Sequence, residues 1–324
     1  MVRTKRVLGK CLGEFSFYLG RSRSLRRPNV LLIEPTTVCN LRCTICPHVS
    51  LARKKEHMSL ELFRSIVEQI DGANETVTLS FMGEPLLHPH LEDMISFAKS
   101  RGLRIGVFTN ALLLDRNRSK KLLDTGLDRL YLSHDVREED YGAVRTGGDF
   151  RATRQNVLDF LEQKRVGKLH YPRTILYSTG AMPDRETVKF WRARVDEFHH
   201  NPTHDWTGTS ELIRSRKSLR SSFRNPICKM PWHGMVILVD GRVVPCCYDS
   251  NAEYIIGDLK EAFLPDLWNN ERMQSLRRMH LERRQSELQL CRCCTSGPDQ
   301  GDTPGLGSLL RQIPRLLNAG RVIR

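Results

Sequence analysis

The sequence has no long hydrophobic run and no secretory signal, and each absence excludes a class of protein. No segment approaches the roughly 18 consecutive apolar residues that a membrane-spanning helix needs, and residues 235–239 are among the longer apolar runs. The first fifteen residues contain no apolar block and no small-residue cleavage site, as a secretory signal would. We therefore expect a cytoplasmic globular protein without a membrane span.

Acidic residues are also scarce, with 37 Asp and Glu against 51 Lys and Arg and a formal net charge of +14. Residues 1–28 hold eight basic side chains and one acidic side chain, so half of the excess lies in a basic leader. Such charge attracts anionic partners or simply forms a solvated surface. No nucleic-acid-binding motif accompanies the basic clusters, so we do not expect nucleic acid as a partner.

The 324 residues are enough for a large core, and from residue 29 short β-rich segments alternate with segments of helical periodicity. The expected strands are 29–35, 76–82, 103–110, 128–133 and 172–178. The expected helices are 59–70, with Ser59 as N-cap, 90–102, 115–125, 150–164 and 184–197. This alternation predicts an α/β fold with a parallel sheet, either an open doubly wound sheet or a partial barrel. Both place the chemistry at the C-terminal ends of the strands.

The alternation stops after residue 206. Two β-type runs in residues 233–247 flank Asp240 and Gly241, which is a strong hairpin signal because the turn needs positive φ. We divide the chain into five parts, of which the fourth is a small cysteine-rich α+β domain. They are the leader 1–28, the core 29–206, a polar linker 207–225, the domain 226–295 and a tail 296–324.

Nine of the ten cysteines form two groups, at 39–46 and 228–294. Without a secretory signal, such clusters indicate metal or iron–sulfur ligands in a reducing compartment. Cys39, Cys43 and Cys46 follow the first strand as C-x3-C-x2-C. Three thiolates on a tight loop can hold three corners of a [4Fe–4S] cluster and leave the fourth iron open. A zinc site completed by His48 is the alternative, which the asymmetric spacing disfavours.

This triplet resembles the cluster motif of the radical S-adenosylmethionine (SAM) superfamily, and the resemblance extends through most of the chain. It implies a partial (β/α)6 TIM-like barrel in which the three cysteines bind the cluster and SAM binds the open iron. Met82-Gly83-Glu84-Pro85 resembles the family's Gly-Gly-Glu-Pro motif, which receives the methionine amino group of SAM. The resemblance therefore implies that Gly83, Glu84 and Pro85 bind SAM, with Glu84 part of the catalytic machinery.

Further correspondences follow at the ends of later strands. Thr109-Asn110 resembles the family's Thr-Asn-Gly, although Ala111 replaces the glycine. The resemblance implies that Asn110 and Ser133 bind SAM, that Asp135 binds SAM or substrate, and that Arg145 lies near the SAM carboxylate. For each of them a capping or surface role is the alternative.

The second group, Cys228-x12-Gly241-x4-Cys246 with Cys291-x2-Cys294, resembles the SPASM or twitch extension. Four thiolates close an auxiliary [4Fe–4S] cluster completely, although a zinc site with four cysteines stays open as the alternative. Cys247 and Cys293 are left over. Cys247 is a candidate catalytic residue that returns a hydrogen atom to a substrate radical, and its alternative is simple burial beside a ligand.

The resemblance implies reductive cleavage of SAM to a 5′-deoxyadenosyl radical that takes hydrogen from a substrate, with the electron supplied by a flavodoxin or ferredoxin. We expect dehydrogenation or epimerisation of a small molecule such as a sugar or aminocyclitol. A maturase of ribosomally made peptides is the alternative, which the short leader disfavours. A non-catalytic electron-transfer or zinc protein is disfavoured by Gly83-Glu84-Pro85.

Overall fold

The computed structural model describes most of the chain between residues 16 and 294. The described residues are 16–25, 27–28, 30–70, 76–135, 137–201, 228–292 and 294. The start of the predicted leader, the predicted linker, the predicted tail and Cys293 lie outside the described residues. No helix among the described residues has the length and hydropathy needed to cross a membrane.

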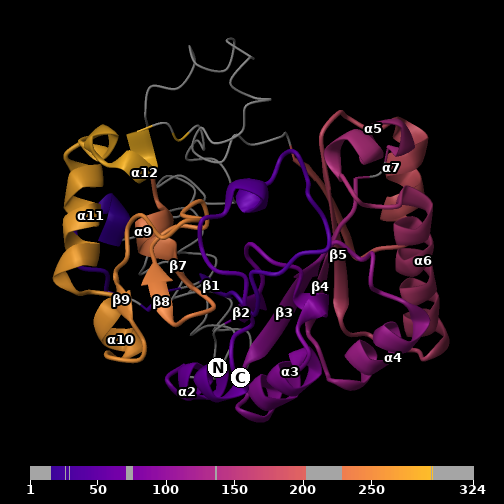
Figure 1. Cartoon of the computed structure of the whole chain (residues 1–324), viewed down its shortest axis with the longest axis horizontal. Coiled ribbons are helices and arrows are strands. Elements are labelled where there is room, and N and C mark those ends of the chain that lie inside the picture. The colour runs from indigo at the N-terminus through magenta and orange to yellow at the C-terminus, as the bar shows by residue number, and fades with distance from the viewer. Residues whose placement is uncertain are drawn as a thin grey trace, which may run out of the picture.

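A single nine-stranded sheet organises the molecule, in the order β6-β5-β4-β3-β2-β1-β7-β8-β9. Its first six strands are parallel and follow each other in chain order. They are β1 (Val30–Ile33), β2 (Thr76–Leu79), β3 (Arg104–Thr109), β4 (Arg129–Ser133), β5 (Arg173–Thr179) and β6 (Glu197–Asn201). The sheet curves without closing (Figure 1), and the strand order places β6 and β9 at its edges. The predicted partial barrel is confirmed.

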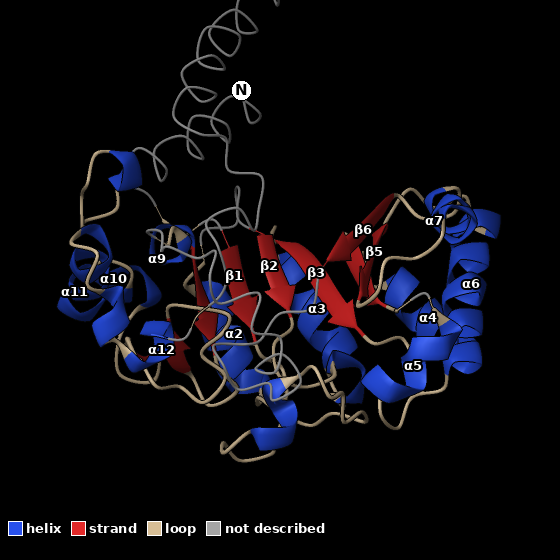
Figure 2. Cartoon of the chain, turned by 90° about the horizontal axis from the view of Figure 1, so that it is seen from above, coloured by secondary structure: helices blue, strands red, loops and turns tan. Residues whose placement is uncertain are grey.

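Helices connect these strands and lie along one side of the curved sheet (Figure 2). They are α2 (Leu60–Glu68), α3 (Leu91–Ser100), α4 (Arg116–Asp124), α6 (Phe150–Val166) and α7 (Arg185–Arg192). Four of the five begin at an N-cap whose side chain accepts a backbone hydrogen bond in the first turn, as predicted for Ser59. The other three caps are Asp115, Asp149 and Asp184.

Two elements of the barrel differ from the prediction. The helix expected to reach residue 197 ends at Arg192, and residues 197–201 form the edge strand β6. A short helix, α5 (Glu138–Val144), follows β4 where none was predicted. Both segments are short and polar, and β6 has a partner on one side only, so hydrophobic periodicity gives little signal for either.

The cysteine-rich region continues the same sheet. Strand β7 (Gly234–Ile237) pairs in parallel with β1, and the predicted hairpin joins it to β8 (Arg242–Val244) through Gly241, at φ 94°. The remaining elements are β9 (Gly257–Asp258), the helices α9 (Met230–His233), α10 (Leu264–Leu267), α11 (Glu271–Leu281) and α12 (Gln289–Arg292), and the 3-10 helices η1 (Pro47–Ser50), η2 (Pro85–Leu87) and η5 (Gln285–Glu287).

The sheet separates two apolar clusters. The large core on the helix side contains Ile33 of β1 and Ile237 of β7 together, so barrel and cysteine-rich region share it. The smaller cluster lies on the opposite face and is built by alternating residues of the same strands. It contains Val236, Leu238, Val244 and Ala252, with Leu32, Phe81, Cys247 and Ile255 packed against it.

The described part of the predicted leader packs against the cysteine-rich region. The indole nitrogen of Trp232 donates to the carbonyl of Arg21 at 2.8 Å, and Lys229 Nζ lies 2.9 Å from the Tyr18 hydroxyl. Arg277, which is fully buried, donates to the carbonyls of Ser22, Pro231 and Trp268 at 2.9–3.0 Å. Residues 16–25 therefore belong to the folded body.

Candidate active site

The first cysteine triplet lies on the loop that follows β1, at the C-terminal end of the strand. The backbone N–H of Cys46 donates to the Cys43 carbonyl at 3.1 Å, which forms the turn of the C-x2-C segment. The loop is tied to the end of α5, because Arg42 N donates to Thr146 O and Thr44 N to Val144 O, both at 2.9 Å. The contiguous motif is thus held by a helix about one hundred residues away.

The three thiols lie near one another, because Cys43 influences the ionisation of both Cys39 and Cys46, and Cys39 influences that of Cys46. Burial is the main effect, raising the pKa of Cys39 to about 11 and that of Cys46 to about 12, and the thiolate charges of the neighbouring cysteines raise both further. The Arg145 guanidinium opposes this effect at all three cysteines. Three converging sulfur donors beside one cation fit a cluster that is bound as thiolates.

A site for a single metal ion such as zinc is the alternative to a cluster. Across the part of the chain that the structure describes, no three His, Cys, Asp or Glu side chains are arranged to hold one metal ion. None of the eight described cysteines forms a disulfide. The zinc alternative would use His48, whose Nε2 lies 2.9 Å from the Thr37 carbonyl. A cubane binds each thiolate to a different iron, so its cysteines stand farther apart than the ligands of one ion.

The loop after β2 lies directly against the cysteine loop. A Cβ on Gly83 would stand 2.2 Å from the Thr36 carbonyl oxygen and 2.8 Å from that of Val38. The next residue, Glu84, donates its backbone N–H to the same Val38 carbonyl at 2.8 Å. The Gly83 position therefore requires glycine, and the Gly-Glu-Pro segment serves to dock two loops.

Glu84 is buried, and both of its carboxylate oxygens have partners. Oε1 accepts from the Thr109 hydroxyl at 2.7 Å and from Leu86 N at 3.1 Å, while Oε2 accepts from Asn110 N at 2.8 Å. Burial raises the pKa of Glu84, and these hydrogen bonds lower it in part. The carboxylate thus ties the end of β2 to the end of β3. These hydrogen bonds give Glu84 a positioning role, and its catalytic role stays a prediction.

The Thr-Asn-Ala segment at the end of β3 has the backbone that the resemblance predicts. Ala111 adopts φ 62°, the left-handed conformation that favours the glycine of the family motif. Asn110 Nδ2 donates to Asn40 Oδ1 at 2.8 Å and so reaches the residue after Cys39. The Nδ2 group of Asn40 is buried and has no partner among the described residues. A buried donor of this kind suits a carboxylate ligand next to the cysteine loop.

Asp135 and Arg145, predicted to bind SAM or substrate, bind each other. Arg145 Nε donates to Asp135 Oδ2 at 2.8 Å, and Nη2 donates to Asp135 Oδ1 at 3.2 Å and to the Ser133 hydroxyl at 2.9 Å. Asp135 also accepts from Thr179 N at 2.8 Å. Both side chains are buried. The carboxylate therefore orients Arg145 beside the cysteine loop, while His134, which directly precedes Asp135, packs against rings on the opposite face of the sheet.

Sequence reasoning missed a row of aromatic rings. Phe108 on β3 pairs with Tyr131 on β4, and Tyr177 on β5 pairs with His199 on β6, and in both pairs the rings stack, with centroids 5.4 and 5.0 Å apart. Tyr131 and Tyr177 are offset by two positions in the register of β4 and β5, and their tilted rings lie 6.2 Å apart. They alternate with core residues, so they lie on the face opposite the helices, and all four are at least partly exposed. The signal was present as an aromatic residue or His in each of four consecutive strands.

The second cysteine group also converges. Burial and the neighbouring Cys246 and Cys294 raise the pKa of Cys228 to about 12. The pKa of Cys291 is raised by burial and by the thiolates of Cys246, Cys228 and Cys294. Cys294 N donates to Cys291 O at 3.1 Å, the same turn as in the first group. The four predicted auxiliary ligands are thus brought together from three segments, and Cys247 lies beside Cys246.

A buried ion pair, also missed, connects the two cysteine groups. Both terminal nitrogens of Arg53 donate to the Glu34 carboxylate at 2.7 Å, and its Nε donates to the Ser250 carbonyl at 2.7 Å. Glu34 also accepts from Val239 N at 3.0 Å. Arg53 follows the first group along the chain and Ser250 follows Cys246 and Cys247, so one guanidinium links both loops to the end of β1.

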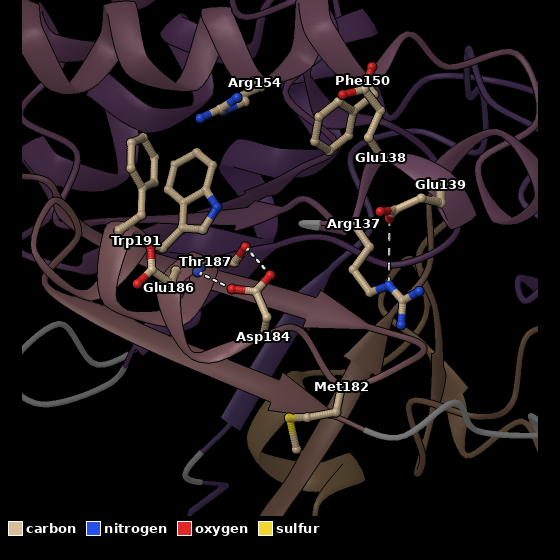
Figure 3. A pocket seen from close by; sticks show the side chains of 11 residues that line it. Arg137, Glu138, Glu139, Phe150, Arg154, Met182, Asp184, Glu186, Thr187 and Trp191 are labelled. Atoms are coloured by element: carbon tan, nitrogen blue, oxygen red, sulfur yellow. Dashed lines mark hydrogen bonds and ion pairs between the residues drawn. The ribbon is translucent and has the colours of Figure 1, made fainter.

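A cavity of about 670 Å³ lies elsewhere, between α5, α6 and α7 (Figure 3). None of the predicted site residues lines it. Two of its charged residues have structural partners: Asp184 caps α7 through Thr187, and Arg137 pairs with Glu139. Phe150, Phe190 and Trp191 contribute an apolar wall. The cavity is therefore separate from the cysteine site.

Comparison with known proteins identifies both regions. Residues 33–166 match the radical SAM superfamily, and residues 228–295 match SPASM, an iron–sulfur cluster-binding domain. The S-adenosyl-L-methionine-dependent 2-deoxy-scyllo-inosamine dehydrogenase of Niallia circulans is 23% identical over 83% of this chain and 93% of its own length.

Two solved structures share the fold. BtrN in complex with AdoMet and 2-DOIA has a TM-score of 0.61 at 19% identity, covering 86% of this chain and 98% of its own. Streptococcus suis SuiB bound to the precursor peptide SuiA has a TM-score of 0.63 at 14% identity, covering 82% of this chain and 70% of its own. The chain belongs to the radical SAM superfamily, carries a SPASM domain, and has SAM and [4Fe–4S] clusters as its cofactors.

Proposed function

We propose that this protein is a radical SAM oxidoreductase that acts on a small polar ring, such as a sugar or an aminocyclitol. The observation that carries the proposal is the extent of the likeness to the inosamine dehydrogenase, which spans 93% of that relative and 98% of the BtrN structure. The proposed reaction is a dehydrogenation, in which a ring carbon that bears a hydroxyl group is oxidised to a carbonyl.

Cys39, Cys43 and Cys46 would hold the cluster that binds SAM. When bound, cluster and SAM together supply the radical that removes a hydrogen atom from the substrate. The protein's own groups then bind and orient: Gly83 and Glu84 fix the loop after β2, and Asp135 and Ser133 hold Arg145 beside Cys43. Asn40, whose buried Nδ2 has no partner among the described residues, and Arg145 would be the donors that receive the SAM carboxylate.

The aromatic row would form the substrate's apolar wall. Phe108, Tyr131 and Tyr177 present partly exposed rings, and the next residues on the same face of β4 and β5 are the polar Ser133 and Thr179. Apolar area with a few placed polar groups is the usual composition of a small-molecule site. A ring compound with apolar faces and hydroxyl or amino substituents at its edge matches both features.

Dehydrogenation removes two electrons and two hydrogens from the substrate. Bound SAM and its cluster would supply the acceptor of one hydrogen atom, an auxiliary cluster would supply the acceptor of the remaining electron, and the hydroxyl proton would go to solvent. Cys228, Cys246, Cys291 and Cys294 would hold that cluster. A flavodoxin or ferredoxin in the reducing cytoplasm would supply the electron that starts each cycle. For a redox-neutral epimerisation Cys247 stays the candidate hydrogen donor.

Peptide maturation is the second candidate, favoured by the TM-score of 0.63 to SuiB with its bound precursor. In the two cases different compounds would lose the hydrogen. Deuterium on the carbon that loses its hydrogen atom would appear in 5′-deoxyadenosine only when the deuterated compound belongs to the true substrate class.

The test uses anaerobically reconstituted protein with dithionite, SAM and ring-deuterated 2-deoxy-scyllo-inosamine or related aminocyclitols. We expect substrate-dependent release of 5′-deoxyadenosine that carries deuterium. A Cys43→Ala variant is the control and should release none. Release of 5′-deoxyadenosine that no sugar or aminocyclitol stimulates, with deuterium transfer from a peptide instead, would replace the proposal by the second candidate.

A further inference from the structure

His280 is a buried side chain next to the auxiliary thiols to which the proposed function gives no role. It lies on α11, only 2% exposed, and its Nε2 is 3.7 Å from the sulfur of Cys291 on α12. This is within hydrogen-bond reach of a sulfur atom. Figure 1 shows the two helices next to each other at the edge of the molecule that carries β8 and β9.

The contact has a preferred direction. The other ring nitrogen of His280, Nδ1, is buried and has no partner among the described residues. A neutral imidazole carries one N–H, and its place is set by the hydrogen bond that the ring makes. Placing it on Nε2 gives it the Cys291 sulfur as acceptor, whereas placing it on Nδ1 would bury an unpaired donor.

Two other polar side chains near Cys291 are committed elsewhere. The Tyr254 hydroxyl donates to the carbonyl of Arg272 at 2.9 Å. The Asp249 carboxylate accepts from the backbone of Glu253 and Tyr254 at 2.7 and 2.9 Å. In the described part of the chain, His280 is therefore the side chain of this group whose hydrogen bond is directed at the ligand sulfur.

We propose that His280 donates an N–H···S hydrogen bond to the Cys291 thiolate and so raises the reduction potential of the auxiliary cluster. Hydrogen bonds to the sulfurs are among the factors that set the potentials of iron–sulfur clusters, as outer groups do at metal sites in general. The bond stabilises the reduced cluster because that state places more negative charge on sulfur. The inference rests on the proposed function, in which this cluster accepts an electron.

Two substitutions of equal polarity and different reach test the bond. In His280→Gln the amide nitrogen takes the place of Nε2 and keeps the donor, whereas in His280→Asn it takes the place of Nδ1, away from Cys291. The measurement is an EPR-monitored redox titration of the reconstituted full chain. We expect about a tenfold smaller equilibrium constant for one-electron reduction of the auxiliary cluster in His280→Asn, a fall of about 59 mV, and a wild-type value in His280→Gln.

The SAM-binding cluster in the same molecule is the internal reference, and its potential should not change. Equal auxiliary potentials in the wild type, Asn and Gln proteins, each with about eight irons per chain, would overturn the inference and leave the proposed function intact. If the Asn protein lost its auxiliary irons, His280→Gln against His280→Glu would decide, because Glu has the length of Gln without the N–H donor. Four irons in the wild type would instead remove the proposed electron acceptor.

Discussion

Among single residues, Gly83 shows how closely the loops of the site approach each other. A methyl group there would meet the backbone of Thr36 and Val38 at 2.2–2.8 Å, and backbone atoms cannot move aside as the end of a flexible side chain could. We expect Gly83→Ala to displace the loop after β2 and to lower the rate of SAM cleavage at least tenfold, with the fold retained. The rate of 5′-deoxyadenosine release measures this effect.

Gly142 supplies the matched control. It lies in α5, and a Cβ there would meet nothing within 4 Å, so Gly142→Ala adds the same methyl group without a clash. Helix propensity predicts that this variant is equally or slightly more stable, by up to about 1 kcal/mol. Wild-type SAM cleavage in Gly83→Ala would show that the two loops do not need their close contact.

His134 predicts a pH dependence of stability. It is fully buried between the rings of Tyr141, Phe150 and Trp191, and burial lowers its pKa to about 3. In the unfolded chain the pKa is near 6.5, so the unfolded state binds the extra proton first as the pH falls. The free energy of unfolding therefore keeps the full contribution of neutral His134 above pH 6.5. Below that pH the contribution is lost progressively, by about 2 kcal/mol at pH 5.

Urea unfolding of wild type and His134→Phe under anaerobic conditions, at pH 7 and pH 5, isolates this contribution. Phenylalanine fits among the rings and removes two unpaired buried nitrogens, so stability at pH 7 should be equal or higher. The loss between pH 7 and pH 5 should be smaller in the variant by about 2 kcal/mol. His90→Gln, on a side chain that is 54% exposed, should keep the wild-type loss. Equal losses in all three proteins would contradict the burial argument.

The sequence predicted the site residues whose signal is local, and it did not predict contacts that depend on a distant partner. The cysteines were found from their spacing, because turns of the C-x2-C type bring neighbours in sequence together. Asp135 and Arg145 were found as polar residues of the site, but their pairing with each other required α5, which the sequence did not reveal. His280 and Glu34 have no motif, since their partners lie 11 and 19 residues away on other elements.

Between elements, the Arg53–Glu34 pair is the contact on which the two cysteine loops depend. Its side chains are 6% and 0% exposed. Removing one partner leaves the other charge buried without compensation, which typically costs about 3–5 kcal/mol. We therefore expect Arg53→Met to lower the free energy of unfolding by about this amount and to weaken retention of both clusters, measured by anaerobic denaturation and iron content.

The neighbouring residue provides the comparison. Lys54 is 80% exposed and lies 3.5 Å from Glu56, so Lys54→Met removes a surface ion pair that contributes about 0–1 kcal/mol. If Arg53→Met were no more harmful than Lys54→Met, the buried pair would not hold the loops.

Elements with strong hydrophobic periodicity were predicted, and those at an edge were not. Strands β1 to β5 are covered by neighbours on both sides, which requires apolar residues that the sequence displays. Strand β6 pairs only with β5 and includes Glu197, His199 and His200, so the end of α7 was extended across it. The hairpin of β7 and β8 was visible from its turn, but its parallel pairing with β1 joins residues two hundred apart and leaves no local trace.

The described part of the molecule is built on one sheet, and its large core is shared between the barrel and the cysteine-rich region, which the sequence predicted as a separate domain. Eleven side chains of the large core come from the cysteine-rich region. They are Met235, Ile237, Val239, Val243, Ile256, Leu259, Leu264, Leu267, Trp268, Met273 and Leu276. Gln69, just after α2, also accepts from Leu264 N at 2.8 Å. The matches to two families therefore mark two cluster sites on one folded body.

A chain that ends at residue 201 tests this unity. It would keep β1 to β6 and the first cysteine group, but β1 would become an open edge, and Leu31 and Ile33 would lose the cover that Met235 and Ile237 provide in the shared core. Burial of each such side chain contributes about 1.5–3 kcal/mol, so losing several exceeds much of a typical stability of 5–15 kcal/mol. An exposed apolar edge strand also templates aggregation. We expect the fragment to aggregate and to bind less than one [4Fe–4S] cluster per chain, measured by size-exclusion chromatography and iron analysis.

The full chain carrying Cys228→Ser and Cys291→Ser is the matched control, because it loses the auxiliary ligands while keeping β7 beside β1. It should stay monodisperse with about four irons. A monomeric fragment that holds four irons and binds SAM would show that the barrel folds without β7.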